Sequence, residues 1–178
     1  MKKILVVVDM QKDFVDGALG SDEAVAIVDN VVKKINEFGG EIIVTYDTHQ
    51  DDYMETREGR FLPVPHCIQD TDGWQLNAKV SEALVAKGEC CVIHKPTFGS
   101  LELIDAVAQR MEEETSTEVI LIGLCTDICV VSNAMLLKAA YPEMNILVDA
   151  SCCAGVTVES HRAALTTMKM CQIEVLGE

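Results

Sequence analysis

The stretch MKKILVVVDMQKDF, residues 1–14, can be interpreted in two ways, and the choice between them decides the fold. Two lysines followed by an apolar run are typical of a secretory signal peptide. Here, however, the apolar run is only five residues long and leads directly into Asp9. We therefore predict a buried β-strand over residues 3–8, and a cytoplasmic protein.

Five further runs have the same character. They are rich in β-branched residues and nearly continuous, which is typical of strands buried on both faces of a parallel sheet. The six predicted strands are residues 3–8, 41–46, 90–94, 118–123, 145–149 and 171–176. Helical patterns separate them, at about residues 21–38, 74–87, 101–114, 129–140 and 157–169. This alternation predicts a three-layer α/β/α sandwich with a six-stranded parallel sheet, a Rossmann-like fold.

The composition is that of a soluble globular protein. The 178 residues are enough to bury a core without disulfides or a structural metal, and we predict a single domain over residues 1–178. No apolar run approaches the ~20 residues of a transmembrane helix. The net charge of −15 argues against nucleic acid and against anionic membrane surfaces, because it offers no basic patch to bind phosphate.

The eight cysteines are expected to be reduced in a cytosolic chain. Their spacing contains no C-x-x-C pair and no zinc-finger pattern. Most lie in apolar segments, where a free cysteine behaves as a small hydrophobe. A plain core or loop role is therefore predicted for seven of the eight.

The residues that follow the apolar runs are the candidates for function, because ligands of an open parallel sheet bind beyond the carboxyl ends of its strands. They are Asp9 after the first strand, Asp47 and His49 after the second, Lys95 after the third, and Cys125 and Cys129 after the fourth. A carboxylate, an ammonium and a thiol thus reach one edge, and the second strand adds metal-type ligands. The irregular segment 47–73 is too long for an ordinary connection, which indicates a functional loop.

Each of these residues also has a structural explanation when taken alone. Asp9 could cap the loop that follows it, and Lys95 could be a solvated turn residue before a proline. Their joint arrival at one edge favours a site. There Asp9 could take the proton of a thiol, and Lys95 could hold both anions together.

Cys129 is the predicted nucleophile. A thiol of ordinary pKa is mostly protonated at neutral pH, so a nucleophilic cysteine needs a base, a cation or a helix N-terminus. Cys129 would open the helix over residues 129–140, with Thr126 or Asp127 as its cap, where the helix dipole favours the thiolate. Cys125 precedes this helix and is the poorer nucleophile, although its backbone N–H could point to the same place.

Three segments carry a resemblance to a known family. They are DMQKDF (9–14), HKPTFGS (94–100) and GLCTDICV (123–130). In order and spacing they resemble the signature segments of the isochorismatase-like cysteine hydrolases, across nearly the whole chain. The resemblance implies an isochorismatase-type hydrolase fold and a catalytic triad of Asp9, Lys95 and Cys129.

Two further segments, DTH (47–49) and LPVPHCIQDTDGW (62–74), are similar to the nicotinamidase-related branch of that family. The branch carries a metal site, and the resemblance implies Asp47, His49 and His66 as ligands. Glu58 is a candidate fourth ligand. Two imidazoles and one carboxylate with open positions suit Zn²⁺, Fe²⁺ or Mn²⁺, and Zn²⁺ is favoured.

The resemblance also implies the reaction. A small carboxamide, with nicotinamide favoured, would be hydrolysed to its acid and ammonia through a thioester on Cys129, a step of NAD salvage. The backbone N–H groups of Cys125 and Cys129 would hold the oxyanion, after a cis peptide between Leu124 and Cys125. Candidate walls for the substrate ring are Phe14, Phe98 and Trp74. By analogy with the family, a homo-oligomer is expected.

Several alternatives remain open at this stage. Another hydrolase of the same family could act on a carbamoyl or ureido substrate. Isochorismate vinyl-ether hydrolysis is less favoured, because branches with that chemistry can lack the cysteine. A non-enzymatic metal or redox module could use Cys125 and Cys129 as a switch, but it would leave Asp9 and Lys95 without a purpose. Neither G-x-G-x-x-G nor a P-loop supports nucleotide binding.

Overall fold

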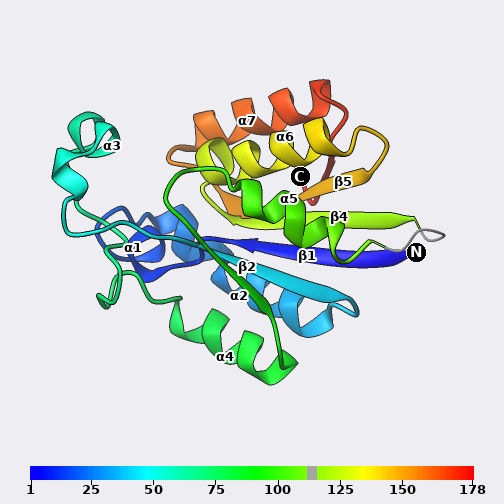
Figure 1. Ribbon diagram of the computed structural model, residues 1–178, viewed down its shortest axis with the longest axis horizontal. Coiled ribbons are helices and arrows are strands. Elements are labelled where there is room, and N and C mark those ends of the chain that lie inside the picture. The colour runs from blue at the N-terminus through cyan, green and yellow to red at the C-terminus, as the bar shows by residue number, and fades with distance from the viewer. Residues whose placement is uncertain (112–115) are drawn as a thin grey trace.

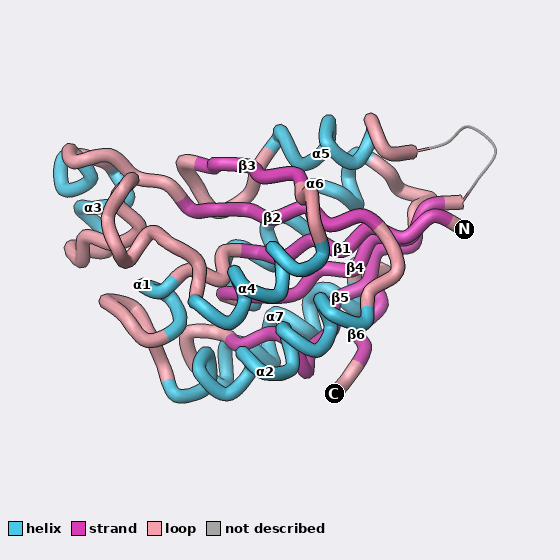
Figure 2. Tube along the Cα trace, turned by 90° about the horizontal axis from the view of Figure 1, so that it is seen from below, coloured by secondary structure: helices cyan, strands magenta, loops and turns pink. Residues whose placement is uncertain are grey.

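The computed structural model describes residues 1–111 and 116–178. These residues form a six-stranded parallel sheet with helices on both faces, which confirms the predicted α/β/α class (Figure 1, Figure 2). The strands lie side by side in the order β3-β2-β1-β4-β5-β6. They are β1 (Lys2–Val8), β2 (Glu41–Asp47), β3 (Cys91–Lys95), β4 (Thr117–Leu124), β5 (Asn145–Ala154) and β6 (Glu174–Leu176).

Five main helices make the two outer layers. One face of the sheet is covered by α2 (Asp22–Glu37) and α4 (Ala78–Lys87), and the other by α5 (Leu101–Ala108), α6 (Val131–Ala140) and α7 (Val158–Met170) (Figure 1). Within the described ranges, none of the helices is both long enough and apolar enough to cross a membrane.

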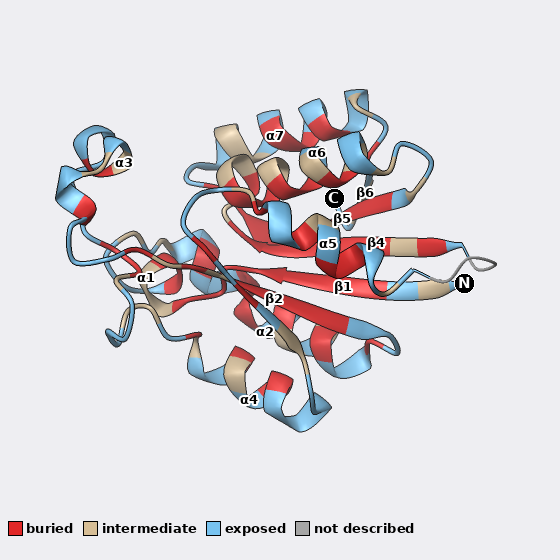
Figure 3. Cartoon of the chain, in the orientation of Figure 1, coloured by how far each residue is buried: buried red, intermediate tan, exposed pale blue. Residues whose placement is uncertain are grey.

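The central strand β1 is buried on both faces, as its unbroken apolar run predicts. Leu5 and Val7 pack into the core under α2 and α4, whereas Ile4, Val6 and Val8 pack under the opposite helices. All five side chains are fully buried, and most of β1 has the colour of buried residues in Figure 3. A strand with two apolar faces has no solvent side, and this fixes its place in the middle of the sheet.

Two short helices, one just after β1 and one in the segment 47–73, were not predicted. Helix α1 (Lys12–Val15) follows β1, and α3 (Arg57–Phe61) follows a 3₁₀ turn over Tyr53–Glu55. Together with this turn, α3 projects from the body of the molecule at the left of Figure 1. Elements of four or five residues complete too few turns to show a helical period in the sequence.

Predicted element boundaries were wrong by three residues or more at four places, one of which is the end of β5, predicted at 149 and found at Ala154. The helix predicted over 101–114 ends at Ala108, and its residues 112–114 lie outside the described part of the chain. Helix α4 begins at Ala78 rather than 74, because the side chain of Asn77 caps it by accepting the Lys79 N–H at 3.1 Å. Strand β6 begins only at Glu174, since Gln172 turns the chain with a φ of 64°.

Gly123 allows β4 to approach β1 closely, and its replacement by alanine should destabilise the protein by about 3 kcal/mol or more. Its φ is +113°, and a Cβ built there would lie 2.1 Å from the carbonyl oxygen of Val8. Urea unfolding measures the loss. Gly39→Ala is the control, because a Cβ at Gly39 meets nothing within 4 Å. Equal stabilities of the two variants would contradict this account.

Candidate active site

The site lies where the strand order reverses. The chain runs from β1 outward to β2 and β3, and then crosses back to β4 on the other side of β1. In such sheets the loops at the carboxyl ends of the two central strands separate and leave a crevice. Asp9 follows β1 and Cys125 follows β4, so the predicted functional edge coincides with this crevice.

Asp9, Lys95 and Cys129 come together there and are almost completely buried. The Lys95 ammonium Nζ lies 2.6 Å from Asp9 Oδ2 and 3.5 Å from Cys129 Sγ. The hydroxyl of Thr45 donates to Asp9 Oδ1 at 2.6 Å. Asp9 has a φ of +47°, which non-glycine residues rarely adopt and which marks a backbone held in place by its surroundings. Three strands thus deliver a base, a cation and a thiol to one point.

The pKa shifts show how charge is arranged in this cluster. Burial raises the pKa of Asp9, and the adjacent Lys95 only partly opposes the shift. Burial alone would lower the pKa of Lys95, but Asp9 and Cys129 raise it, so the ammonium stays charged. Burial, followed by repulsion from Asp9, raises the pKa of Cys129 well above that of a free thiol. Burial and the neighbouring carboxylate thus oppose ionisation of the Cys129 thiol, which the predicted effect of the helix dipole did not take into account.

The turn after β4 also differs from the predicted helix start. The peptide bond between Leu124 and Cys125 is cis, as predicted. A turn of π-helix over Thr126–Val130 follows it and leads into α6, so Cys129 lies within this turn and no side chain caps it. The two predicted caps are engaged elsewhere. Thr126 bonds to His161, and the Asp127 carboxylate accepts the N–H of Val156 at 3.1 Å.

The four predicted metal ligands form a second group beside the triad, the metal cluster, which consists of these four side chains. One ligand atom from each of Asp47, His49, Glu58 and His66 lies within 4.8 Å of all the others. His49 Nε2 lies 3.0 Å from Asp47 Oδ2 and 3.6 Å from Glu58 Oε1. His66 Nε2 lies 3.6 Å from Asp47 Oδ2 and 3.8 Å from Glu58 Oε1. Asp47, His49 and His66 are buried, and Glu58 is half-buried.

The chemistry of this cluster fits a divalent cation. Nδ1 of His66 lies 2.8 Å from the carbonyl oxygen of Val64 and can donate to it, which leaves the lone pair of Nε2 facing two carboxylates. Lone pairs and anions that converge in a buried space repel one another unless a cation lies between them. The donor set of two imidazoles and two carboxylates matches Zn²⁺, Fe²⁺ or Mn²⁺.

Asp47 joins the two clusters. Its Oδ2 faces His49 and His66, and its Oδ1 lies 3.5 Å from the Lys95 ammonium. Burial alone would raise the pKa of Asp47, but its contacts with His49 and His66 and the positive charge of Lys95 hold it well below its usual range. The buried carboxylate therefore stays ionised between the predicted catalytic cation and the predicted metal site.

A cavity of about 480 Å³ opens onto both clusters. Cys129, Asp47, Glu58 and His66 form its polar part. The remaining wall is mostly apolar and includes Phe14, Leu19, Ala24, Leu62, Phe98, Leu124, Ile128 and Val156. Few polar groups in an apolar cleft are typical of sites for small molecules. Phe14 and Phe98 thus line the cavity, and their contact with a substrate stays a prediction.

Trp74 does not line this cavity. Its ring stacks on His94 at a centroid distance of 5.4 Å and packs against Tyr46 at 5.3 Å. Its Nε1 donates to the hydroxyl of Thr48 at 3.0 Å. Trp74 therefore anchors the segment before α4 against β2 and β3, and the sequence prediction of a substrate wall is not met by its position.

Sequence reasoning missed two residues that hold the metal cluster. Gln11 is fully buried, and its amide both donates to the carbonyl of Asp47 and accepts the N–H of Asp47, each at 2.8 Å. Tyr53 is also buried, and its ring packs against His49 and His66 at 4.7 and 5.0 Å. The sequence signal for Gln11 was its position two residues after Asp9. No sequence signal pointed to Tyr53.

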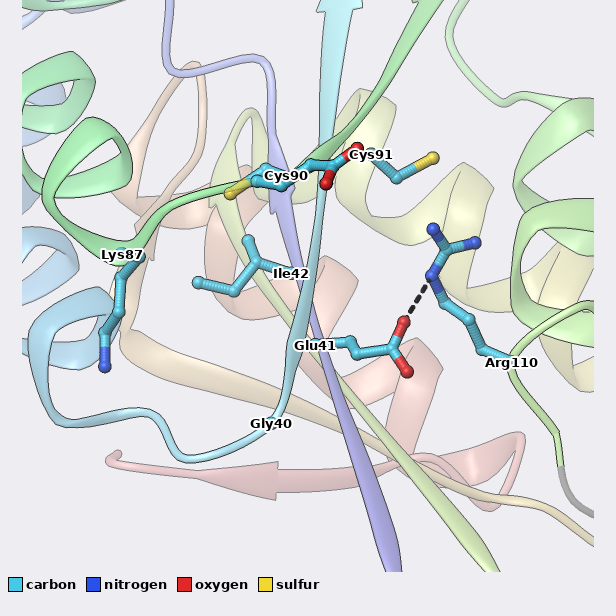
Figure 4. A pocket seen from close by; sticks show the side chains of 8 residues that line it. Gly40, Glu41, Ile42, Lys87, Cys90, Cys91 and Arg110 are labelled. Atoms are coloured by element: carbon cyan, nitrogen blue, oxygen red, sulfur yellow. Dashed lines mark ion pairs between the residues drawn. The ribbon is translucent and has the colours of Figure 1, made fainter.

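A second cavity of about 430 Å³ lies at the opposite edge, beside the first residues of β2 and β3 (Figure 4). Glu41 and Arg110 form an ion pair across it at 2.9 Å, and Cys90 and Cys91 point to different sides. The cavity shares no residue with the triad or the metal cluster. The triad and the metal cluster thus both lie at the carboxyl edge of the sheet, away from this second cavity.

Comparison with known sequences agrees with this geometry. The family model of the isochorismatase domain matches residues 3–177. A protein of the isochorismatase family from Bacillus subtilis is 30% identical over 179 residues, which cover 93% of each chain. A nicotinamidase of Schizosaccharomyces pombe is 24% identical, over 98% of this chain and 92% of its own.

Solved structures give the same picture. A nicotinamidase/pyrazinamidase from Bacillus subtilis superimposes with a TM-score of 0.84 and 28% identity, covering 99% of this chain and all of the other. The pyrazinamidase of Pyrococcus horikoshii, solved in complex with zinc, has a TM-score of 0.76 and 25% identity, with both chains fully covered.

Proposed function

Because the chain belongs to the isochorismatase family, we propose that it is a cysteine-dependent amidohydrolase that converts nicotinamide to nicotinate and ammonia. The observation that carries the proposal is the single buried Lys95, which contacts both Asp9 and Cys129 and lies beside the metal cluster. A non-enzymatic metal or redox module would not need this buried ion pair. The relatives that act on nicotinamide support the choice of substrate.

In the proposed reaction Asp9 first takes the proton of the Cys129 thiol, and the sulfur attacks the amide carbonyl carbon. The backbone N–H groups of Cys125 and Cys129 donate to the oxyanion. When the intermediate collapses, the C–N bond breaks and Asp9 gives its proton to the leaving ammonia. Lys95 keeps the two developing anions close together throughout.

The second half of the reaction repeats these roles with water. Asp9 takes a proton from water, the hydroxide attacks the thioester carbonyl, and the C–S bond breaks. The acid leaves and Asp9 returns the proton to the sulfur, which restores the starting state. The raised pKa of Asp9 suits a group that must both take and give a proton near neutral pH.

A divalent metal would be held by Asp47, His49, His66 and Glu58. When bound, it supplies a Lewis-acidic position that can accept a ring nitrogen of the substrate. The apolar walls at Phe14 and Phe98 would then contact the faces or edges of the ring. With the ring held in this way, the carboxamide of the substrate would lie with its carbonyl carbon next to Cys129.

The direct test is to incubate the purified protein with nicotinamide and to measure ammonia and nicotinate together. We expect both products in equal amounts. Release of ammonia from a carbamoyl or ureido compound, with none from nicotinamide, would support a different branch of the family and contradict this proposal.

The acid limb of the pH profile should lie above the ordinary carboxyl pKa. Only the ionised form of Asp9 can accept the thiol proton, and burial raises its pKa above 3.8. We therefore expect kcat/KM to fall as the pH is lowered through that raised pKa. The measurement is kcat/KM from pH 4 to pH 9. A kcat/KM that shows no acid limb within this range would show that Asp9 is not the titrating base.

We also propose, from the family relationship, a single-domain cytoplasmic protein that forms a homo-oligomer. Light scattering of the purified protein gives its mass in solution, and a monomer would contradict the last of these points.

A further inference from the structure

The turn that carries Cys125 and Cys129 is tied to the start of α7. Thr126, the residue after Cys125, is completely buried. Its hydroxyl oxygen lies 2.8 Å from Nδ1 of His161, a residue in the first turns of α7. Asp127 accepts the N–H of Val156, just before α7, at 3.1 Å. Two consecutive residues of the turn are thus held by one segment that contributes neither to the triad nor to the metal cluster.

The hydrogen bonds inside the turn do not fix its direction. The carbonyl of Cys125 accepts the N–H groups of Ile128 and Val130 at 3.1 and 3.0 Å, which makes the turn compact. A compact turn can still rotate about its junction with β4. The bond from Thr126 to His161 lies next to that junction, so it opposes this rotation.

The surroundings of His161 are built for this contact. A Cβ at Gly155 would lie 2.9 Å from the Cβ of His161, so the glycine lets the connection from β5 to α7 pass close to the first turn of α7. Burial lowers the pKa of His161, so its ring is neutral at neutral pH. A neutral imidazole can form one hydrogen bond with the Thr126 hydroxyl, either as donor or as acceptor.

We propose that His161 is a positioning residue: through Thr126 it keeps the backbone N–H of Cys125 aimed at the carbonyl oxygen of the substrate. This inference rests on the proposed amide hydrolysis. Misplacing a catalytic group by a fraction of an ångström costs rate rather than substrate affinity, because the oxygen gains its full charge only in the transition state.

The test compares two pairs of matched variants. His161→Leu removes the polar atom, whereas His161→Asn keeps one close to the position of Nδ1. Thr126→Val removes the hydroxyl and keeps the shape, whereas Thr126→Ser keeps the hydroxyl. We expect His161→Leu and Thr126→Val each to lower kcat about 10-fold and to change KM less than about 2-fold. The Asn and Ser variants should recover most of the rate.

The double variant His161→Leu/Thr126→Val separates this role from general destabilisation. If both residues act through one bond, the double variant loses about 10-fold, like each single variant. Losses that multiply to about 100-fold would overturn the proposal. A kcat of His161→Leu within 2-fold of the wild type would overturn it as well.

Hydrogen exchange of the backbone amides over residues 124–131 provides a measurement that needs no substrate. We expect faster exchange of this turn in His161→Leu than in the wild type and in His161→Asn. A wild-type protein without activity on nicotinamide contradicts the proposed function, and faster exchange would still support the link from His161 to the turn. Unchanged exchange in His161→Leu overturns the link itself.

Discussion

Cys129→Ala is expected to lower the rate of nicotinamide hydrolysis by at least about 10⁴-fold, to the background of the assay. The Cys129 sulfur is the only nucleophile of the triad that can form a covalent intermediate with the substrate. Lys95 cannot, since it is protonated and engaged with Asp9. The variant leaves the apolar wall and the metal ligands intact. Its substrate affinity, measured by calorimetry, should therefore change much less than its rate.

The matched control for this change is Cys125→Ala. Cys125 lies in the same turn and lines the same cavity, but its proposed contribution is a backbone N–H, which alanine keeps. We expect its rate to stay within about 5-fold of the wild type. If the Cys125 variant were inactive and the Cys129 variant active, the two cysteines would have exchanged roles and the mechanism would be wrong.

Loss of the metal cluster should have the second largest effect. His49→Ala removes one of the two imidazoles, and we expect kcat/KM to fall about 100-fold or more, because the ring of the substrate loses its anchor. Treatment of the wild type with a chelator should give the same loss, and adding Zn²⁺, Fe²⁺ or Mn²⁺ back should restore it. Metal analysis of the two proteins reports occupancy independently of activity.

His94→Ala is the control for that experiment. His94 lies on β3, stacks on Trp74 and does not belong to the metal cluster. Its replacement should leave the metal content unchanged and the activity within about 3-fold of the wild type. Full activity of the chelated protein and of His49→Ala would remove the metal from the mechanism and leave the triad proposal standing.

The parts of this protein that could be predicted from the sequence are those governed by local pattern. The apolar runs predicted the six strands, and the polar residues just past them predicted which side chains share an edge. Asp9 and Lys95 were found in this way, because parallel strands place their carboxyl ends together whatever lies between them in the chain.

The parts that could not be predicted depend on packing between segments far apart in the sequence. Trp74 has the kind of large aromatic side chain that suits a substrate wall, but the hydroxyl of Thr48 and the ring of His94 hold it outside the cavity. Gln11 supports the metal cluster through its bonds to Asp47 on the neighbouring strand, and Tyr53 does so because its segment folds back onto His49. The raised pKa of Cys129 follows from burial, which no helix-dipole argument on the sequence could supply.

The arrangement of Asp9 on β1 and Cys129 just after β4 also bears on how activity appears during folding. The two strands are neighbours in the sheet, but β2 and β3 with their connections lie between them in the chain. Closing so long a loop costs chain entropy, and pairings of this kind form late when a protein assembles. A chain in which the helices had formed but β1 and β4 had not yet paired would therefore have no site. Enzymatic turnover reports completion of the central β1–β4 pairing, rather than collapse of the chain as a whole.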